Sequence, residues 1–409
     1  MDVAMALAVL FFCLLLLCSA AIVFLLLRHL FRPRRRPRGA DPEAISSSVR
    51  QAPIPSPPSS PPQQEQPLMQ LQQLLSWAGE EKKELKEKEM KEEEAEGPRK
   101  LTWREVEALT GGFDEAAVVG RGGSSTVYLA GVSPSSSPVA VKVHRWCGGG
   151  ERRLRAFRQE LDLLRRLRHP HIVSLLAYSD NHEEGGALVL EYLAGGTLAE
   201  RLHGGASSSP LPWRHRMRIL HDVAAALEHL HDGSPPVVHG DVSASNVLLG
   251  AGAGSVRLCD LGSACEGFSA AVAPTRAAVG SPGYVDPFFL RTGIVSKKSD
   301  VYSFGVLLLE AITGSPAAGS VSGNLTARLL PRVRAEGVEM GVVVDRRLGD
   351  EYDVAEAGDV ARIAVECVAA QPGLRPTMAH VRKAIAEKAA SSISIAAAAD
   401  HGLHGSNST

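Results

Sequence analysis

The stretch that decides the fold is His239-Gly240-Asp241-Val242-Ser243-Ala244-Ser245-Asn246, which is followed, after a strand-like run at 256–259, by Asp260-Leu261-Gly262. It carries two carboxylates and one amide around a short strand. In such a set, one carboxylate can orient a hydroxyl and accept its proton, while the Asn and the second Asp hold Mg²⁺ against phosphate groups. The stretch therefore indicates phosphoryl chemistry.

A glycine-rich turn lies upstream, at Gly120-Arg121-Gly122-Gly123-Ser124-Ser125-Thr126-Val127, between two strand-like runs. Without a Cβ, its backbone N–H groups can approach phosphate oxygens, although similar turns also join ordinary hairpins. The next strand, Val139-Ala140-Val141-Lys142, ends in a lysine that needs a charged partner, because an unpaired buried ammonium is costly. The helix at 154–167 offers Glu160 on its apolar face, so we expect the pair Lys142 and Glu160.

Between residues 101 and 390 the hydrophobic period changes in an ordered way. Strand-like runs lie at 118–129, 139–143 and 187–192, whereas apolar residues have helical spacing at 154–167, 218–230 and 301–312. A strand-rich part therefore precedes a helix-rich part. This order predicts an α+β domain with two lobes rather than a doubly wound sheet.

The composition limits the classes of protein to which the chain can belong. The chain has 409 residues, of which 44% are apolar, and its formal net charge is −1 with a sequence pI near 6.9. That is enough apolar material for a sizeable core, and the charge balance points to no nucleic-acid partner. The six cysteines show no CxxC or metal-ligand spacing, which suits a reducing compartment.

The N-terminus predicts one membrane span. Residues 3–27 contain no charge, and 25 residues are enough to cross a hydrocarbon core of roughly 30 Å as a helix. The alternative, a cleaved signal peptide, would have Asp2 and no basic residue in its n-region. Six arginines follow in the basic juxtamembrane segment 28–38, so the rest of the chain is expected in the cytosol. From Arg28 to Arg38 the segment either contacts anionic lipids or serves only as a topology signal.

Two further segments are expected to lack a core. Residues 39–100 combine a Pro, Ser and Gln-rich linker with a charged spacer at 80–96, which is either helical or disordered. The tail at 391–409 is rich in Ala, Ser and Gly, and we expect it to be disordered.

Taken together, these motifs resemble the eukaryotic protein kinase domain. Gly280-Ser281-Pro282-Gly283-Tyr284-Val285-Asp286-Pro287 and Ser299-Asp300-Val301-Tyr302-Ser303-Phe304-Gly305 complete the family's order. Leu101-Thr102-Trp103, Phe113 and Trp213 look like plant receptor-like and receptor-like cytoplasmic Ser/Thr kinases of the Pelle-related group. The likeness covers about 280 residues. It implies a small lobe at 113–193 and a large lobe at 194–390.

The resemblance implies ATP and Mg²⁺ (or Mn²⁺) as cofactors, and a role for each matching residue. Asp241 becomes the catalytic base, Asn246 and Asp260 the metal ligands, and Lys142, fixed by Glu160, the residue that holds the α and β phosphates. The ATP-binding residues become Gly120, Arg121, Gly122, Gly123, Val127, Ala140, Lys142, Leu190, Glu191, Leu193 and Leu248. The activation segment includes Asp260, Leu261, Gly262 and Ser281, and a stacked apolar spine, or simply ordinary core, is formed by Leu164, Leu175, His239 and Leu261.

Several positions depart from the family. Ser125 replaces a glycine of the lid, Gly240 replaces the arginine through which phosphorylation orders the activation segment, and Ser243 replaces a lysine beside the γ-phosphate. Phe288 replaces a glutamate, so Arg375 is expected to lose the partner that the family provides.

Two hypotheses follow. The first is an active single-pass Ser/Thr kinase, expected at the plasma membrane, with protein substrates and receptor or co-receptor partners. The second is a catalytically weak or dead scaffold with the same fold.

Overall fold

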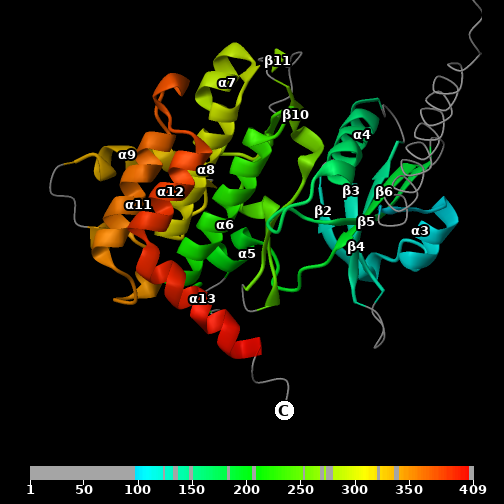
Figure 1. Ribbon diagram of the computed structural model, residues 1–409, viewed down its shortest axis with the longest axis horizontal. Helices are drawn as coiled ribbons and strands as arrows, with labels where there is room; N and C mark the ends of the chain where they lie inside the picture. The colour runs from blue at the N-terminus through cyan, green and yellow to red at the C-terminus, as the bar shows by residue number, and fades with distance from the viewer. Residues whose placement is uncertain are drawn as a thin grey trace, which may run out of the picture. The chain divides into compact units, whose positions relative to one another are not determined.

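The computed structural model describes residues 97–122, 125–131, 137–146, 151–181, 185–204, 209–251, 254–267, 271–272, 280–319, 323–335 and 340–404. They form a strand-rich small lobe and a helix-rich large lobe (Figure 1). The predicted two-lobed α+β class is therefore confirmed. Among these residues there is no helix long and apolar enough to cross a bilayer. The predicted span at 3–27, the basic segment and most of the linker lie outside the described residues.

The small lobe is built on one six-stranded sheet in the order β1-β5-β6-β4-β3-β2, with β1 parallel to β5 and the other pairs antiparallel. The strands are β1 (Arg99–Lys100), β2 (Val118–Arg121), β3 (Ser125–Ala130), β4 (Val139–Arg145), β5 (Leu175–Asn181) and β6 (Gly185–Glu191). The sequence missed β5 and β1. Lys100 and Arg99, predicted as linker, pair with Tyr178 and Ala177.

Side chains alternate between the two faces of this sheet, as the pleat requires. On β4, Val141 and Val143 face a cluster that includes Val106 of helix α3 (Trp103–Leu109). Ala140 belongs to the opposite cluster, which includes Phe157 of helix α4 (Glu151–Arg166). The small lobe therefore begins before residue 113, because α3 and β1 are part of it.

The large lobe is mostly helical. Its helices are α5 (Leu198–His203), α6 (Trp213–Asp232), α7 (Pro287–Thr292), α8 (Lys297–Thr313), α9 (Leu325–Val333), α10 (Met340–Val343), α11 (Val354–Cys367), α12 (Met378–Lys388) and α13 (Ala390–His404). Its short strand pairs are β7 (Val237–Val238) with β10 (Cys265–Glu266), β8 (Val247–Leu249) with β9 (Val256–Leu258), β11 (Ala271–Val272) with β12 (Ile294–Val295), and β13 (Ala318–Gly319) with β14 (Gly323–Asn324). Helix α8 is buried over nearly its whole length, so the other helices pack around it.

The prediction of a disordered tail from residue 391 is wrong as far as residue 404. Helix α13 packs against α6 (Figure 1). Ser392 is 9% exposed and donates its hydroxyl to Glu356 Oε2 at 2.5 Å, while Trp213 donates to the same oxygen at 3.0 Å. The helix is held by this buried polar contact and by Ala389 and Ala396, which are fully buried.

Candidate active site

Lys142 lies at the centre of the site because the β4 alternation turns it toward α4. Its Nζ is 2.8 Å from both carboxylate oxygens of Glu160 and 2.9 Å from Asp260 Oδ1. Lys142 is 8% exposed and Glu160 1%. Burial disfavours the charged ammonium, but the carboxylates of Glu160 and Asp260 outweigh it, so the pKa of Lys142 is raised above its ordinary value. The lysine therefore stays charged and links the two lobes.

Asp300 of α8 fixes the loop that carries Asp241. Its Oδ2 accepts the backbone N–H of His239 at 2.8 Å and its Oδ1 accepts that of Gly240 at 2.9 Å. His231 approaches the same carboxylate at 2.8 Å. Asp300 is 1% exposed, so the loop is tied to the most buried helix of the large lobe. No role was predicted for Asp300 from the sequence; the available signal was an acidic residue in the first turn of a long apolar helix.

Asp241 has both carboxylate oxygens oriented by neighbours. Its Oδ1 accepts the N–H of Ser281 at 2.7 Å, and its Oδ2 lies 3.2 Å from Asn246 Nδ2. The same Nδ2 donates to the backbone oxygen of Asp241 at 2.8 Å. Asp241 remains partly exposed, so an acceptor hydroxyl can reach a carboxylate whose direction is already set.

The residues predicted as metal ligands have suitable oxygens. Because Asn246 uses its amide nitrogen on Asp241, its amide oxygen could serve as a ligand of a cation. Asp260 is in the left-handed region, with φ of 65°, and its side chain is 44% exposed. Among the described residues no three His, Cys, Asp or Glu side chains gather into a metal site of their own. Two oxygen donors that share Mg²⁺ with nucleotide phosphates fit this arrangement.

Most of the remaining residues predicted to bind the nucleotide lie on strands of the small lobe or in the segment after β6. Gly120 and Val127 pair across β2 and β3, and Ala140 pairs with Leu190 across β4 and β6. Leu193 is 8% exposed, and Leu248 is half-buried on β8. Two residues predicted to bind ATP do not join this group. Arg121 directs its guanidinium to Glu115, and Gly123 lies outside the described residues.

Glu191, predicted to face adenine, uses its carboxylate elsewhere. Its Oε1 accepts the N–H of Ser174 at 2.8 Å and pairs with Arg257 Nε at 2.9 Å. Its backbone N–H donates to Ser174 O at 3.1 Å, so only its backbone carbonyl could meet a nucleotide base.

The four residues predicted as an apolar spine are all buried. Leu164, Leu175 and Leu261 belong to one cluster, and His239 is fully buried with Nε2 3.1 Å from Cys259 O. Their burial is equally consistent with ordinary core packing.

The segment Gly280–Asp286, which we call the acceptor segment, meets the catalytic loop at Ser243. The hydroxyl of Ser281 donates to Ser243 Oγ at 3.2 Å, and Ser243 is fully buried. A pair of serines thus occupies the place where the family has a lysine. Gly240 has φ of +79°, and a Cβ there would lie 2.5 Å from Ser263 O. Glycine is therefore required by this backbone.

Phe288 offers Arg375 no carboxylate, as expected, but Arg375 has another partner in Asp286. Its guanidinium makes two parallel contacts with Asp286, at 2.7 and 2.8 Å, and donates to Ala369 O at 2.8 Å. Both charged side chains are 2% exposed. The bidentate geometry is favourable for a buried ion pair, so the end of the acceptor segment remains anchored to the large lobe.

The two-lobed domain brings a buried Lys–Glu pair, a loop with a catalytic base and two oxygen donors for a metal ion to one site. This arrangement is that of a protein kinase. Residues 113–384 match the protein kinase domain family. Protein kinase domains use ATP and a divalent metal ion.

Similar proteins with curated names define the group of protein kinases to which the chain belongs. Salt tolerance receptor-like cytoplasmic kinase 1 of Oryza sativa subsp. japonica is 53% identical over 303 residues, which cover 72% of this chain and 81% of the relative. A probable receptor-like protein kinase of Arabidopsis thaliana is 40% identical over 299 residues, 68% of this chain and 85% of the relative. A probable LRR receptor-like serine/threonine-protein kinase of the same plant is 35% identical over 285 residues, 69% of this chain but 31% of the relative. The chain belongs to the plant receptor-like serine/threonine protein kinase family.

Proposed function

We propose that this protein transfers the γ-phosphoryl group of ATP to serine or threonine hydroxyls of protein acceptors. The observation that carries the proposal is Lys142, held at once by Glu160 of α4 and by Asp260 at the start of the activation segment. In this arrangement Lys142 can hold phosphates, Asp260 and Asn246 can hold the metal ion, and Asp241 can accept the proton of the acceptor hydroxyl. The metal supplies charge stabilisation of the transferring group.

The test is phosphoryl transfer by the full chain with labelled ATP and Mg²⁺ or Mn²⁺. Wild type should label itself or a generic protein acceptor, and Asp241→Ala should not. Phosphoamino-acid analysis should return phosphoserine or phosphothreonine. Wild-type and Asp241→Ala signals that are equal would contradict the proposal.

A scaffold with little or no activity is the second candidate, and Ser243 is the observation that favours it. A buried serine bonded to Ser281 leaves the γ-phosphate without the lysine contact of the family. Loss of one such contact costs about 3–4 kcal/mol at a transition state. A nucleotide-binding protein without measurable transfer under both metals would support the scaffold.

We further propose that residues 3–27 anchor the protein in a membrane, expected to be the plasma membrane, with the kinase domain in the cytosol. The support is the uncharged run itself and the six arginines that follow it, which also suit anionic lipid headgroups. Receptor or co-receptor proteins are the expected upstream partners. Protease protection on sealed vesicles tests the topology: the kinase domain should be digested without opening the vesicle.

A further inference from the structure

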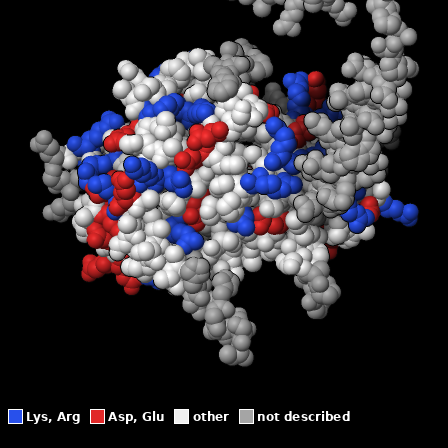
Figure 2. All heavy atoms as spheres, in the orientation of Figure 1, with Lys and Arg blue, Asp and Glu red and all other residues white. Residues whose placement is uncertain are grey.

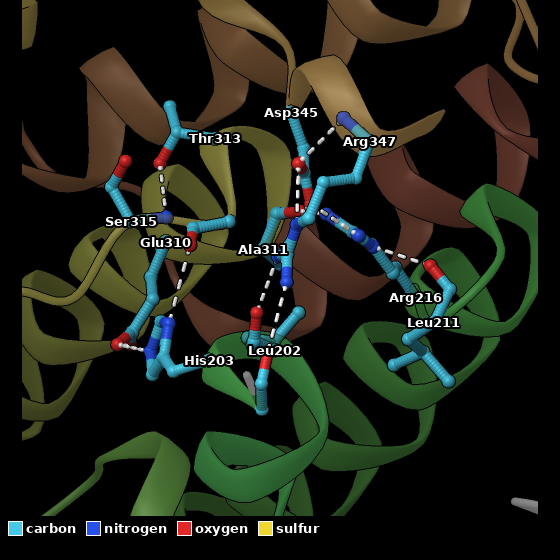
Figure 3. Close-up of polar contacts among 12 residues, drawn as sticks. Leu202, His203, Leu211, Arg216, Glu310, Ala311, Thr313, Ser315, Asp345 and Arg347 are labelled. Carbon is cyan, nitrogen blue, oxygen red and sulfur yellow. Dashed lines mark hydrogen bonds and ion pairs between the residues drawn. The ribbon is translucent and has the colours of Figure 1, made fainter. Parts of the chain in front are cut away.

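A chain of hydrogen bonds begins at His203, the last residue of α5. The imidazole Nε2 is 2.8 Å from Glu310 Oε1 of α8, and Nδ1 is 3.2 Å from Gly314 O. Figure 3 shows His203 directed at Glu310, beside the neighbouring contacts of Thr313 with Ser315. The His203 side chain is 23% exposed, whereas that of Glu310 is 3% exposed. A half-buried histidine thus meets a buried carboxylate.

The chain continues from Glu310 to the catalytic loop. Glu310 Oε2 accepts the hydroxyl of Tyr284, which belongs to the acceptor segment. The Tyr284 hydroxyl in turn accepts the backbone N–H of Ala244 at 3.1 Å. Ala244 lies between Asp241 and Asn246 in sequence. Four parts of the large lobe are therefore joined: α5, α8, the acceptor segment and the catalytic loop.

The direction of each proton in the chain follows from the groups involved. Gly314 O only accepts, so Nδ1 of His203 carries a hydrogen. The hydroxyl of Tyr284 receives the Ala244 N–H, so it gives its own hydrogen to Glu310 Oε2. The contact between Nε2 and Oε1, at 2.8 Å, therefore shares one proton between His203 and Glu310.

We propose that His203 is a positioning residue for phosphoryl transfer: through Glu310 and Tyr284 it holds the Ala244 amide and thereby the catalytic loop. This inference rests on the proposed kinase activity for its effect on rate, but its effect on the loop does not depend on catalysis. Without the imidazole, Glu310 would lose its histidine donor and would keep the Tyr284 hydroxyl and the backbone N–H of Ala317. Loss of one hydrogen bond to a buried carboxylate is costly, so the carboxylate would be reoriented and its present contact with Tyr284 would change.

The surroundings of the pair favour this role. Burial raises the pKa of Glu310, and the hydrogen bond from His203 opposes that rise. The other charged groups nearby already have partners: Arg347 donates to Asp345 Oδ1 at 3.0 Å and reaches the backbone oxygen of Leu202. Asp345 also pairs with Arg216 at 2.6 Å. Neither arginine forms an ion pair with Glu310, so His203 is the one basic side chain that pairs with it among the described residues.

The test compares His203→Leu, Tyr284→Phe and the double variant in the full chain. Hydrogen exchange of peptides covering residues 239–246 reports the Ala244 amide directly. We expect each single variant to speed exchange at least about threefold, and the double variant to add nothing further, because both changes break one chain. His221→Leu is the matched control: its imidazole is also 23% exposed and bonded to a carboxylate, that of Asp222, but not linked to Tyr284. It should leave the exchange unchanged.

The kinetic arm measures transfer to a generic protein acceptor such as dephosphorylated casein. His203→Leu should lower kcat about tenfold with little change in the KM for ATP, since one buried hydrogen bond is lost away from the nucleotide. His203→Gln keeps a donor for Glu310 and should restore most of the rate. Unchanged exchange in His203→Leu, or additive effects in the double variant, would overturn the inference. A wild-type protein without transfer would refute the proposed function alone, because the exchange data would still decide the role of His203.

Discussion

At the scale of single residues, the site contains a buried polar side chain that is fully hydrogen-bonded beside one that is not. Lys142 has three carboxylate contacts, whereas His144 lies two positions further along β4 with both ring nitrogens buried and without a hydrogen-bond partner among the described residues. His144 is 2% exposed and packs on Phe157 with ring centroids 5.4 Å apart. Lys142 and His144 therefore lie on the same face of β4, although the first makes three hydrogen bonds to carboxylates and the second makes none to the described residues.

Lys142→Met should reduce phosphoryl transfer at least about a hundredfold, because the ammonium is a preorganised charge at the phosphates. The fold should survive, since most of the core lies elsewhere. Thermal melting beside single-turnover kinetics checks both statements. Lys100→Met, which removes an exposed lysine paired with Asp180 on the same sheet, should keep wild-type turnover.

His144→Leu should raise stability by about 1–3 kcal/mol, because a buried imidazole without partners is replaced by an apolar side chain. Denaturant unfolding measures the change. His171→Leu serves as the contrast, since its Nδ1 lies 3.3 Å from Val256 O and its loss should destabilise.

The same residue predicts a pH dependence. Burial, aided by the charge of Lys142, lowers the pKa of His144 from 6.5 to about 3. The unfolded state then binds more protons, so stability falls as pH drops from 6.5 toward 3, by up to about 1.4 kcal/mol per pH unit. His144→Leu should flatten this slope in unfolding curves measured between those limits.

Ser243→Lys separates the active enzyme from the scaffold. If an ammonium can reach the γ-phosphate, kcat should rise severalfold over a measurable wild-type rate. The competing effect is strain, because Ser243 is fully buried against Ser281, and strain would lower the melting temperature instead. No transfer by either protein would favour the scaffold.

At the scale of elements, the question is what holds α4 and the activation segment together when Gly240 provides no side chain. Arg166, at the end of α4, makes two parallel contacts with Glu266 of β10, at 2.9 and 3.0 Å. Strand β10 pairs with β7, directly before the catalytic loop. Basic and acidic side chains are interspersed over the face shown in Figure 2. The ion pair of Arg166 with Glu266 bridges the two lobes.

Arg166→Glu and Glu266→Arg should each lower kcat, and the charge-swapped double variant should recover part of the loss. The pair is exposed, 52% and 36% for the two side chains, so its coupling should be no more than about 1 kcal/mol. A double-mutant cycle on kcat at low and at high salt measures it, and the coupling should shrink as salt rises. A cycle without coupling at low salt would contradict this role.

The elements also show where sequence reasoning succeeds and fails. The contact between Lys142 and Glu160 could be predicted from the sequence, because the chemistry demands particular side chains at a fixed spacing. Helix α13 was missed because alanine and serine carry no apolar period; only the surface of α6 and the carboxylate of Glu356 reveal why it forms. The partner of Arg375 was missed because Asp286 lies 89 residues away, and pairing across such a distance cannot be read from spacing.

At the scale of the whole molecule, one buried charge network holds the large lobe together. Arg216 of α6 is fully buried and donates to Leu211 O, to Ala311 O of α8 and to Asp345, as Figure 3 shows. Arg347 adds contacts to Asp345 and, near the end of α5, to Leu202 O. Three helices therefore depend on one carboxylate.

Asp345→Ala should cost about 3–5 kcal/mol, because it leaves the Arg216 guanidinium buried without a counter-charge. Chemical denaturation gives the value, and Asp350→Ala, an exposed position close by in sequence, should change it by less than about 0.5 kcal/mol. Equal stability of the two variants would show that the network is not important to the lobe.

The edge strand β1 has a mechanical consequence. It is two residues long and exposed, and it is held to β5 by its parallel pairing, by Leu101 N–H on Tyr178 O at 2.7 Å and by the ion pair of Lys100 with Asp180. Any tension carried along the chain from residues 1–96 reaches the kinase domain at this strand first. With so few bonds, β1 should peel away under load while the five antiparallel-paired strands stay intact. A pull on the N-terminal side of the domain would then be absorbed at the edge of the sheet before it reached Lys142.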